Sequence, residues 1–302
     1  MLLNDFQPSY FPTASRILVI GDIHGDVQTF MKCMYAANVF NTKLEWIAEP
    51  KDTIVVQLGD QVDSMTRGGK DDWETVPDVE MLYLTDRLDT IARMKGGRVL
   101  SLLGNHELMN VTGDFSYVSP ASSQRIDPQL RQQMFRPGGT LSQILAKRNV
   151  ILRIGHHLFC HGGILPHHLD AANNNIQTIN DSTRKFLRNL PLTQQEGQVL
   201  SRCIFDMQGI LWSRLYVELF EKNKEVLEQV VENVLQNTQS RHIFVGHNTV
   251  QSVTPILNAK VIFTDVGLSR AYPIEGIQMV EILNVSQPNE EINILRSNYG
   301  AS

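Results

Sequence analysis

The stretch RILVIGDIHG, residues 16–25, sets the pattern for the whole chain. Its first half, Arg16–Ile20, is a short, largely apolar run of the kind that predicts a buried strand. A glycine ends the run, and Asp22 and His24 follow two residues apart. Residues i and i+2 of an extended segment share a face, so both side chains point the same way. The stretch therefore predicts a buried strand that ends in two polar, ligand-type side chains.

The same unit recurs four more times along the chain. The later turns that follow strand candidates are Gly59-Asp60-Gln61-Val62-Asp63, Gly104-Asn105-His106-Glu107, His161-Gly162-Gly163 and Gly246-His247-Asn248. One such turn on its own would be an ordinary polar turn. Together, the five turns predict one shared site at the edge of a sheet where α/β folds bind ligands.

Strand-like runs alternate with helical stretches over most of the sequence. The further strand candidates are Thr53–Leu58, Arg98–Leu103, Val150–Cys160, Arg241–Val245, Lys260–Thr264 and Ile277–Leu283. The helical candidates are Val27–Ala37, Pro77–Met94, Pro137–Arg148 and Leu211–Asn237. This alternation predicts a layered α/β architecture with the helices outside the sheets. We expect the last two strands to follow each other in a mixed sheet.

Three polar stretches interrupt this rhythm, namely Ser64–Pro77, Asn110–Pro137 and His167–Gln198. None holds enough apolar residues for a core of its own. We therefore expect a single catalytic domain over residues 1–302, with surface insertions near 64–77, 110–137 and 167–198.

Composition excludes several classes of protein. The 302 residues are 42% hydrophobic and 20% charged, a balance that disfavours disorder, collagen and coiled coil. The net charge of −5 gives no strong nucleic-acid signal. The three cysteines form no Cys-x-x-Cys pair, and no apolar run reaches the length of about 18 residues that a membrane helix needs. The N-terminus lacks the basic residues of a secretory signal, so we expect a soluble cytoplasmic protein without a membrane partner.

The ligand types indicate the chemistry. Carboxylate, imidazole and amide groups without thiolate suit Mn, Fe or Zn in a catalytic site. Two divalent ions that share a carboxylate can activate a water and neutralise a phosphoryl oxygen. The pattern therefore favours phosphoester hydrolysis.

The ordered set GDIHG, GDQVD, GNHE, HGG and GH resembles the metallophosphoesterases of the phosphoprotein phosphatase superfamily, from Asp22 to His247 in the family's order. The block Gly104–Asn110, with Gly113-Asp114 and Tyr117-Val118 after it, is similar to the Shewanella-like branch of bacterial-type protein phosphatases, as is Asp265–Ser269. The resemblance implies an α-β-β-α metallophosphoesterase sandwich, with two mixed sheets flanked by helices.

The resemblance also implies a site that holds two divalent metal ions, with Mn favoured in vitro. Asp22 and His24 would hold the first ion, and Asp60 would bridge to the second. The remaining ligands of the second ion would be Asn105, His161 and His247. A hydroxide that bridges the ions would attack phosphorus in line.

Two further residues match the acid machinery of the family. His106 would be the general acid, and Asp63 would orient and charge it. A carboxylate beside an imidazole raises the pKa of the imidazole and fixes its tautomer, so the pairing is physically sound. Glu107 is expected to have a structural role in the turn.

The arginines that bind phosphate match the family less well. Many members continue GDxVD with Arg-Gly, but Ser64-Met65 stands here. Arg67 follows three residues later, a spacing that does not fit a direct replacement, although an approach of Arg67 from the loop stays open. The segment Leu211-Trp212-Ser213-Arg214 resembles the family's Trp-x-Arg, so Arg214 is the expected phosphate contact, with bidentate guanidinium geometry.

Three functions remain open from the sequence. The first is a protein phosphatase that hydrolyses phosphomonoesters on serine/threonine or tyrosine. The second is a hydrolase of diadenosine polyphosphates or RNA caps with the same metal core. The third is an inactive metal-binding scaffold, which the complete ligand set with His106 and Asp63 disfavours.

Other polar residues receive no catalytic role. The histidines set aside in this way are His156, His157, His167, His168 and His242. Strand alternation turns Cys160 away from His161, so we expect it to be packed. Tyr117 and the arginines of the second insertion, Arg125, Arg131 and Arg136, would form either a lid over the substrate or a solvated basic loop.

Overall fold

The structure of the chain is a computed structural model that describes residues 6–70, 73–273 and 276–298. Within these residues, eleven strands form two mixed sheets. The five-stranded sheet has the order β11-β10-β2-β3-β4, and the six-stranded sheet has the order β1-β5-β6-β7-β9-β8. Their bounds are β1 Tyr10–Phe11, β2 Arg16–Ile20, β3 Ile54–Gln57, β4 Arg98–Ser101, β5 Ile151–Ile154, β6 His157–Cys160, β7 His242–Val245, β8 Thr254–Ile256, β9 Val261–Phe263, β10 Gly276–Leu283 and β11 Glu291–Asn298.

The two sheets face each other, and alternate side chains of each strand enter different layers. In β2, Ile17 and Val19 pack between the sheets against Phe159 and Phe244. Leu18 of the same strand belongs to the cluster beneath the flanking helices. All five residues of β2 are buried, as expected for a strand covered on both faces.

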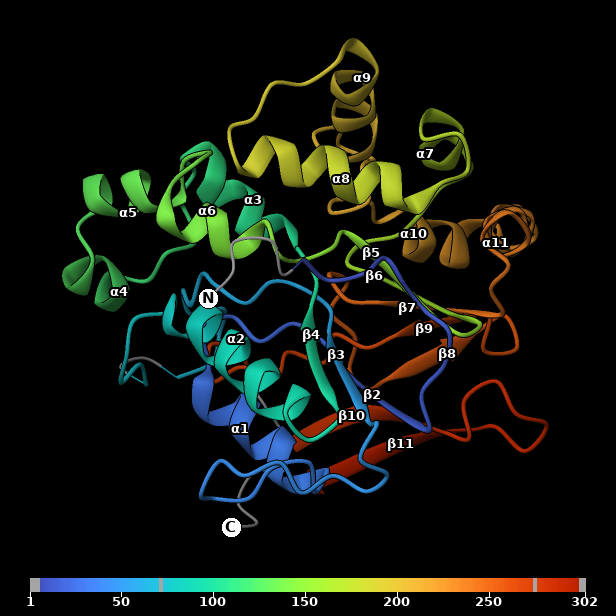
Figure 1. Ribbon diagram of the computed structural model, residues 1–302, viewed down its shortest axis with the longest axis horizontal. Helices are drawn as coiled ribbons and strands as arrows, with labels where there is room; N and C mark the ends of the chain where they lie inside the picture. Colours follow the sequence, from blue (N-terminus) through green and yellow to red (C-terminus); the bar gives the residue numbers. More distant parts are fainter. Residues whose placement is uncertain (1–5, 71–72, 274–275, 299–302) are drawn as a thin grey trace.

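Helices cover the outer face of each sheet (Figure 1). Helices α1 (Val27–Ala36) and α2 (Glu80–Arg93) pack on the five-stranded sheet. The other helices are α3 Asn105–Thr112, α4 Pro120–Arg125, α5 Pro128–Phe135, α6 Thr140–Leu145, α7 Pro166–Ala171, α8 Ile176–Leu187, α9 Gln194–Cys203, α10 Leu215–Lys222 and α11 Lys224–Thr238. Buried residues from most of these helices share one cluster with the six-stranded sheet, so the expected α-β-β-α sandwich is confirmed.

Two expected elements are divided in the structure. The run Val150–Cys160 is a hairpin of antiparallel strands β5 and β6, because Gly155 at φ +56° allows the tight turn between them. The stretch Leu211–Asn237 contains two helices that meet at Asn223, whose side chain accepts the Val226 N–H and caps α11.

The expectation for the last two predicted strands is wrong. The strand within Lys260–Thr264 is β9 of the six-stranded sheet, and the strand within Ile277–Leu283 is β10 of the other sheet. The mixed character of the sheets comes instead from the antiparallel pairs β8–β9, β10–β11, β10–β2 and β5–β6.

The polar stretches are more structured than expected. Helices α4 and α5 lie within Asn110–Pro137, and α7 to α9 lie mainly within His167–Gln198. Ile176 and Ile179 of α8 belong to the main core, so the surface position expected for this stretch is wrong for α8. The amphipathic spacing of α8 was the signal that sequence reasoning missed. The description of these stretches as insertions into a single domain stays a prediction.

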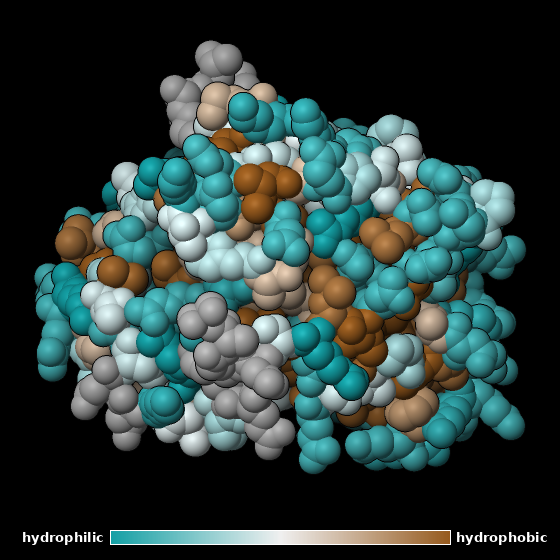
Figure 2. All heavy atoms as spheres, turned by 90° about the horizontal axis from the view of Figure 1, so that it is seen from below, coloured by the Kyte–Doolittle hydropathy of each residue, from teal (hydrophilic) through white to brown (hydrophobic). Residues whose placement is uncertain are grey.

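The face on the side of α1 is largely hydrophilic, with hydrophobic side chains gathered near its centre (Figure 2). An apolar groove is lined by residues from the segment 32–47 and by β10, among them Tyr35, Phe40, Ile47 and Ile277. Within the described residues, no helix is both long and apolar enough to cross a membrane.

Candidate active site

Four of the five predicted turns contribute residues to one cavity of about 860 Å³, and the fifth, which begins at His161, lies buried beside it. They follow the parallel strands β2, β3 and β4 of one sheet and the parallel strands β6 and β7 of the other. The carboxyl ends of parallel strands lie at the same edge of a sheet, which explains the convergence. Predicted site residues that line the cavity are Asp22, His24, Asp60, Asn105, His106, Arg214 and His247. His161 and Asp63 are fully buried directly behind this wall.

The backbone at the site adopts unusual conformations. His24, Asp60, Asp63 and His247 have φ values of +41°, +52°, +69° and +62°. This left-handed region is costly for residues with a side chain, and such strain concentrates at functional sites. Close packing also requires glycine, since a Cβ on Gly104 would lie 2.2 Å from Oδ1 of Asp60.

Three predicted metal-ligating histidines each have one ring nitrogen near a backbone carbonyl. Nδ1 of His24 lies 3.3 Å from the Val62 oxygen, and Nδ1 of His161 lies 2.9 Å from the Leu58 oxygen. Nε2 of His247 lies 3.0 Å from the Trp212 oxygen. A carbonyl can only accept, so that nitrogen carries the hydrogen and the other offers a lone pair. This arrangement is typical of histidines that bind metals.

Acceptor atoms face one another around Asp60. Nε2 of His161 lies 2.9 Å from Oδ1 of Asn105 and 3.2 Å from Oδ2 of Asp60. Burial lowers the pKa of His161, but the charge of Asp60 outweighs it and raises this pKa above its usual value. The environment of Nε2 therefore favours a positive charge, which a proton or a metal ion can supply.

The carboxylates here are crowded as well. Burial, together with the charges of Asp265 and Asp60, raises the pKa of Asp22 well above its usual value. Ligand atoms within 4.8 Å of one another form two groups, His24–Asp60–His106 and Asp60–His161–His247, which share Asp60. Asp22 stands beside them, with its carboxylate accepting the His247 N–H at 3.0 Å. The donor set therefore fits two adjacent divalent cations.

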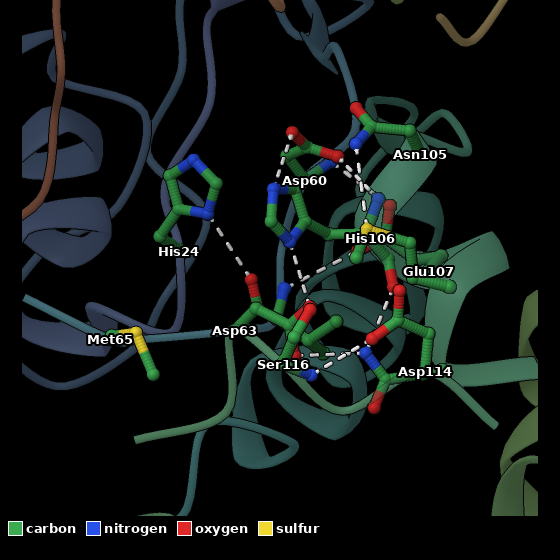
Figure 3. Close-up of polar contacts among 12 residues, drawn as sticks. His24, Asp60, Asp63, Met65, Asn105, His106, Glu107, Asp114 and Ser116 are labelled. Carbon is green, nitrogen blue, oxygen red and sulfur yellow. Dashed lines mark hydrogen bonds and ion pairs between the residues drawn. The ribbon is translucent and has the colours of Figure 1, made fainter. Parts of the chain in front are cut away.

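His106 lies between Asp60 and Asp63 (Figure 3). Its Nδ1 is 2.7 Å from Oδ2 of Asp63, and its Nε2 is 3.8 Å from Oδ2 of Asp60. Burial lowers the pKa of His106, but the charges of Asp60 and Asp63 outweigh burial and raise it. The ring is thus fixed in orientation, with Nε2 at the cavity wall.

A buried network that sequence reasoning missed supports Asp63. Oδ1 of Asp63 accepts the Asn110 amide at 2.8 Å and lies 3.4 Å from Nη2 of Arg131. Arg131 is 1% exposed and forms two hydrogen bonds with Asp78, at 2.8 and 2.7 Å. The interpretation of Arg131 as part of a lid or a solvated loop is therefore wrong. Burial raises the pKa of Asp63, whereas His106 and Arg131 act to lower it.

Glu107 holds the turns together, as expected. Its carboxylate accepts the backbone N–H groups of Asp60, Gln61 and Gly104 at 2.9, 2.7 and 2.7 Å. These bonds tie the turn after β3 to the turn after β4, so Glu107 has a structural role.

Two arginines reach the cavity from different sides. Nη1 of Arg214 donates to the His247 carbonyl at 3.2 Å and to Oδ1 of Asn248 at 3.1 Å. Arg67 also lines the cavity, with its Nη2 3.5 Å from Nε2 of His106. Its backbone N–H is bonded to the Ala271 oxygen at 2.6 Å, which brings the loop back over the site. Spacing along the chain could not reveal this placement.

Aromatic side chains form part of the cavity wall. The guanidinium of Arg67 lies 5.1 Å from the ring centre of Tyr117 and 5.4 Å from that of Tyr272. The Tyr117 ring meets the His106 ring edge-on at 5.0 Å. Trp212 and Met207 line the same cavity. Tyr117 thus forms part of the cavity wall, whereas Arg131 of the same segment does not.

The remaining residues to which the sequence analysis gave no catalytic role do not line the cavity. Cys160 is fully buried in the core, as expected. His168 is buried, and its Nδ1 accepts the Leu165 N–H at 3.1 Å. His157 is buried at the start of β6, and the neighbouring His156 is partly exposed. Arg125 is exposed and donates to the Glu74 carbonyl.

Comparisons with known proteins identify a family of phosphoesterases. The profile of the calcineurin-like phosphoesterases (Metallophos) matches residues 15–264. Shewanella-like protein phosphatase 2 of Arabidopsis thaliana is 24% identical over 314 aligned residues, covering 88% of this chain and 75% of that protein. Shewanella-like protein phosphatase 1 of Plasmodium berghei is 27% identical, covering 84% and 67%.

The fold is similar to that of a solved protein. The crystal structure of a cold-active protein-tyrosine phosphatase from a psychrophilic Shewanella species has a TM-score of 0.73, at 22% identity. The match covers 97% of this chain and 84% of that one.

Proposed function

The chain belongs to the calcineurin-like phosphoesterase family, and from this premise we propose that it removes phosphate from phosphoproteins with the help of two metal ions. One observation carries the proposal: a cluster of convergent acceptor atoms adjoins an oriented Asp63–His106 pair in one cavity. The names of the similar proteins support a protein substrate. Nothing in them supports the diadenosine-polyphosphate or RNA-cap alternative, which is not favoured.

The proposed metal ligands follow the sequence expectation. Asp22 and His24 would serve one ion and Asp60 both, and the second ion would also take Asn105, His161 and His247. The histidine nitrogens that carry no hydrogen fit this use, as does the crowding of carboxylates. Two bound divalent cations would lower the pKa of a water and offset phosphoryl charge. Mn²⁺ is the first metal to test, because these oxygen and nitrogen ligands accept Mn, Fe or Zn.

His106 would act as the general acid. The Asp63 carboxylate holds Nδ1–H, so Nε2 is the nitrogen that faces the cavity. Transfer of a proton from Nε2 to the leaving oxygen leaves a neutral imidazole, and the Asp63 carboxylate acts to raise the pKa of His106, which favours the protonated ring before the transfer. Asp63 stabilises the charged form of the ring before the transfer.

Arg214 and Arg67 would bind the phosphate oxygens. Both guanidinium groups line the cavity, on the side of His247 and of His106 respectively. Arg67 would take the place of the arginine that is missing after Asp63. Guanidinium donors match phosphate oxygens in a bidentate geometry.

The cavity wall favours an aromatic phosphoester. The rings of Tyr117 and Tyr272 both lie close to the Arg67 guanidinium, and Trp212 lines the same cavity. Aromatic side chains contact a phenyl ring well in offset or edge-to-face geometry. We therefore expect a phosphotyrosyl peptide to be the better substrate.

The experiment measures phosphate release with added Mn²⁺ from three substrates in parallel: a phosphotyrosyl peptide, a phosphoseryl peptide and a dinucleoside tetraphosphate. His106→Asn is the matched control for activity that does not come from this site. We expect the phosphotyrosyl peptide to have the highest kcat/KM. A preference for the phosphoseryl peptide would overturn the aromatic assignment, and a preference for the dinucleotide would overturn the protein-phosphatase assignment.

A further inference from the structure

A second group of ligand-type side chains lies away from the cavity. His157, His242 and Glu290 offer atoms that all lie within 4.8 Å of one another. His157 begins β6 and His242 begins β7, and Glu290 directly precedes β11. The two strands run parallel, so these histidines lie at the opposite strand ends from His161 and His247. The group is thus separate from the catalytic ligands.

The contacts within the group resemble those of a metal site. Nδ1 of His242 lies 2.8 Å from the Ala259 carbonyl oxygen, so Nδ1 carries the hydrogen and Nε2 offers a lone pair. The His157 ring is stacked on the His242 ring at 5.2 Å, with 22° between the planes. Nε2 of His157 lies 3.0 Å from Oε2 of Glu290.

The donor atoms of the group suit a cation. Glu290 offers a carboxylate oxygen, and His157 and His242 each offer a ring nitrogen. One carboxylate with two imidazoles is a donor set that suits borderline transition metals.

We infer that His157, His242 and Glu290 form a second metal site, separate from the catalytic centre, for a transition-metal dication of the Zn²⁺ class. A cation held there links the turn between β10 and β11 to the first residues of β6 and β7. The same two strands lead to His161 and His247, so the site braces the sheet that carries these residues. Its role is structural, and the chemistry at the cavity does not require it.

The test counts Zn²⁺ bound by the full chain after equilibrium dialysis. The variants are Glu290→Gln, which keeps the shape of the side chain, and His242→Gln. The matched control is His156→Gln. His156 directly precedes His157 in the turn between β5 and β6, and it belongs to none of the groups of ligand-type side chains. We expect Glu290→Gln and His242→Gln to bind one equivalent less than the natural chain and the control. Turnover with Mn²⁺ should stay unchanged in all of them.

Two results would overturn the inference: equal zinc counts in all four proteins, or the same loss in the control. Circular dichroism checks that each variant folds. If His242→Gln does not fold, Glu290→Gln decides the question alone, because glutamine keeps the size and shape of the glutamate side chain. Co²⁺ gives an independent measurement. The visible absorption of bound Co²⁺ should be weaker in Glu290→Gln than in the natural chain.

Discussion

The two halves of the active site differ in how far the protein's own groups satisfy one another's charges and hydrogen bonds. Around His106, protein groups hold the reactive ring: Asp63 binds Nδ1 of the ring, and Asn110 and Arg131 contact Asp63. Around Asp60, a lone pair of His161 faces two oxygen atoms. The first half is ordered by the protein alone, whereas the second needs added positive charge. We therefore expect substitutions in the two halves to fail in different ways.

The largest effect should come from Asp60→Asn. Both groups of ligand atoms share this carboxylate, so its loss should remove bound metal together with nearly all turnover. Metal analysis of the purified variant checks the first effect, and phosphate release checks the second. Asp114→Asn at the cavity rim is the matched control and should keep its metal. Unchanged metal content in Asp60→Asn would contradict the bridging role.

His106→Asn should fail in the opposite way. Metal content and folding should persist, because the ring contributes to the acid half of the site. Turnover should fall by about 10²–10⁴-fold, the range for loss of a general acid. The loss should be greater on phenyl phosphate than on p-nitrophenyl phosphate, whose better leaving group needs less protonation. Full activity in this variant would refute the acid assignment.

Arg131→Lys should show whether the buried network acts through Asp63. The variant keeps the charge but loses the fork that joins Asp78 and Asp63. We expect turnover to fall on the order of 10–100-fold, the range for outer contacts that orient a reactive group. As for His106→Asn, phenyl phosphate should suffer more than p-nitrophenyl phosphate.

The control for this network is Arg125→Lys, an exposed arginine of the same segment. It should leave turnover unchanged on both substrates. Equal losses of Arg131→Lys on the two substrates would indicate general disorder of the site rather than a defect in proton transfer.

The smallest effect should come from Arg214→Ala. This arginine adjoins the metal half through the His247 carbonyl and makes no contact with His106. A lost charge-assisted hydrogen bond of about 1.5 kcal/mol corresponds to roughly 10-fold weaker binding. The inhibition constant of free phosphate should rise by that factor while metal content stays constant. An unchanged constant would leave Arg67 as the arginine that binds phosphate.

The sequence was informative where chemistry and local pattern coincide. Asp22, Asp60 and Asn105 directly follow buried strands, and parallel strands must bring such residues to one edge. The ends of the elements were predicted less well, since the turn at Gly155 divides one continuous strand candidate and the cap at Asn223 divides one continuous helix candidate. Both residues are signals that a closer reading of turn and cap preferences would find.

Contacts between distant segments could not be predicted in this way. Arg131 stands 68 residues from Asp63 in a polar stretch, where an arginine is normally solvated. It is buried because Asp78 and Asn110 supply the partners that its charge requires. The position of Arg67 also depends on a distant segment, because the hydrogen bond from its backbone N–H to the Ala271 oxygen determines where the loop lies.

The sequence by itself thus determined the layered α/β class and the expected ligand types, because strand periodicity and the turns after the strands are local properties. The family and its sandwich fold followed from the resemblance of the ordered motifs. The tertiary structure alone decided that Arg67 reaches the cavity, that Arg131 supports Asp63 and that His157, His242 and Glu290 meet at the other end of the strands. These groupings depend on the register of strands and loops far apart in the chain, and no local pattern encodes that register.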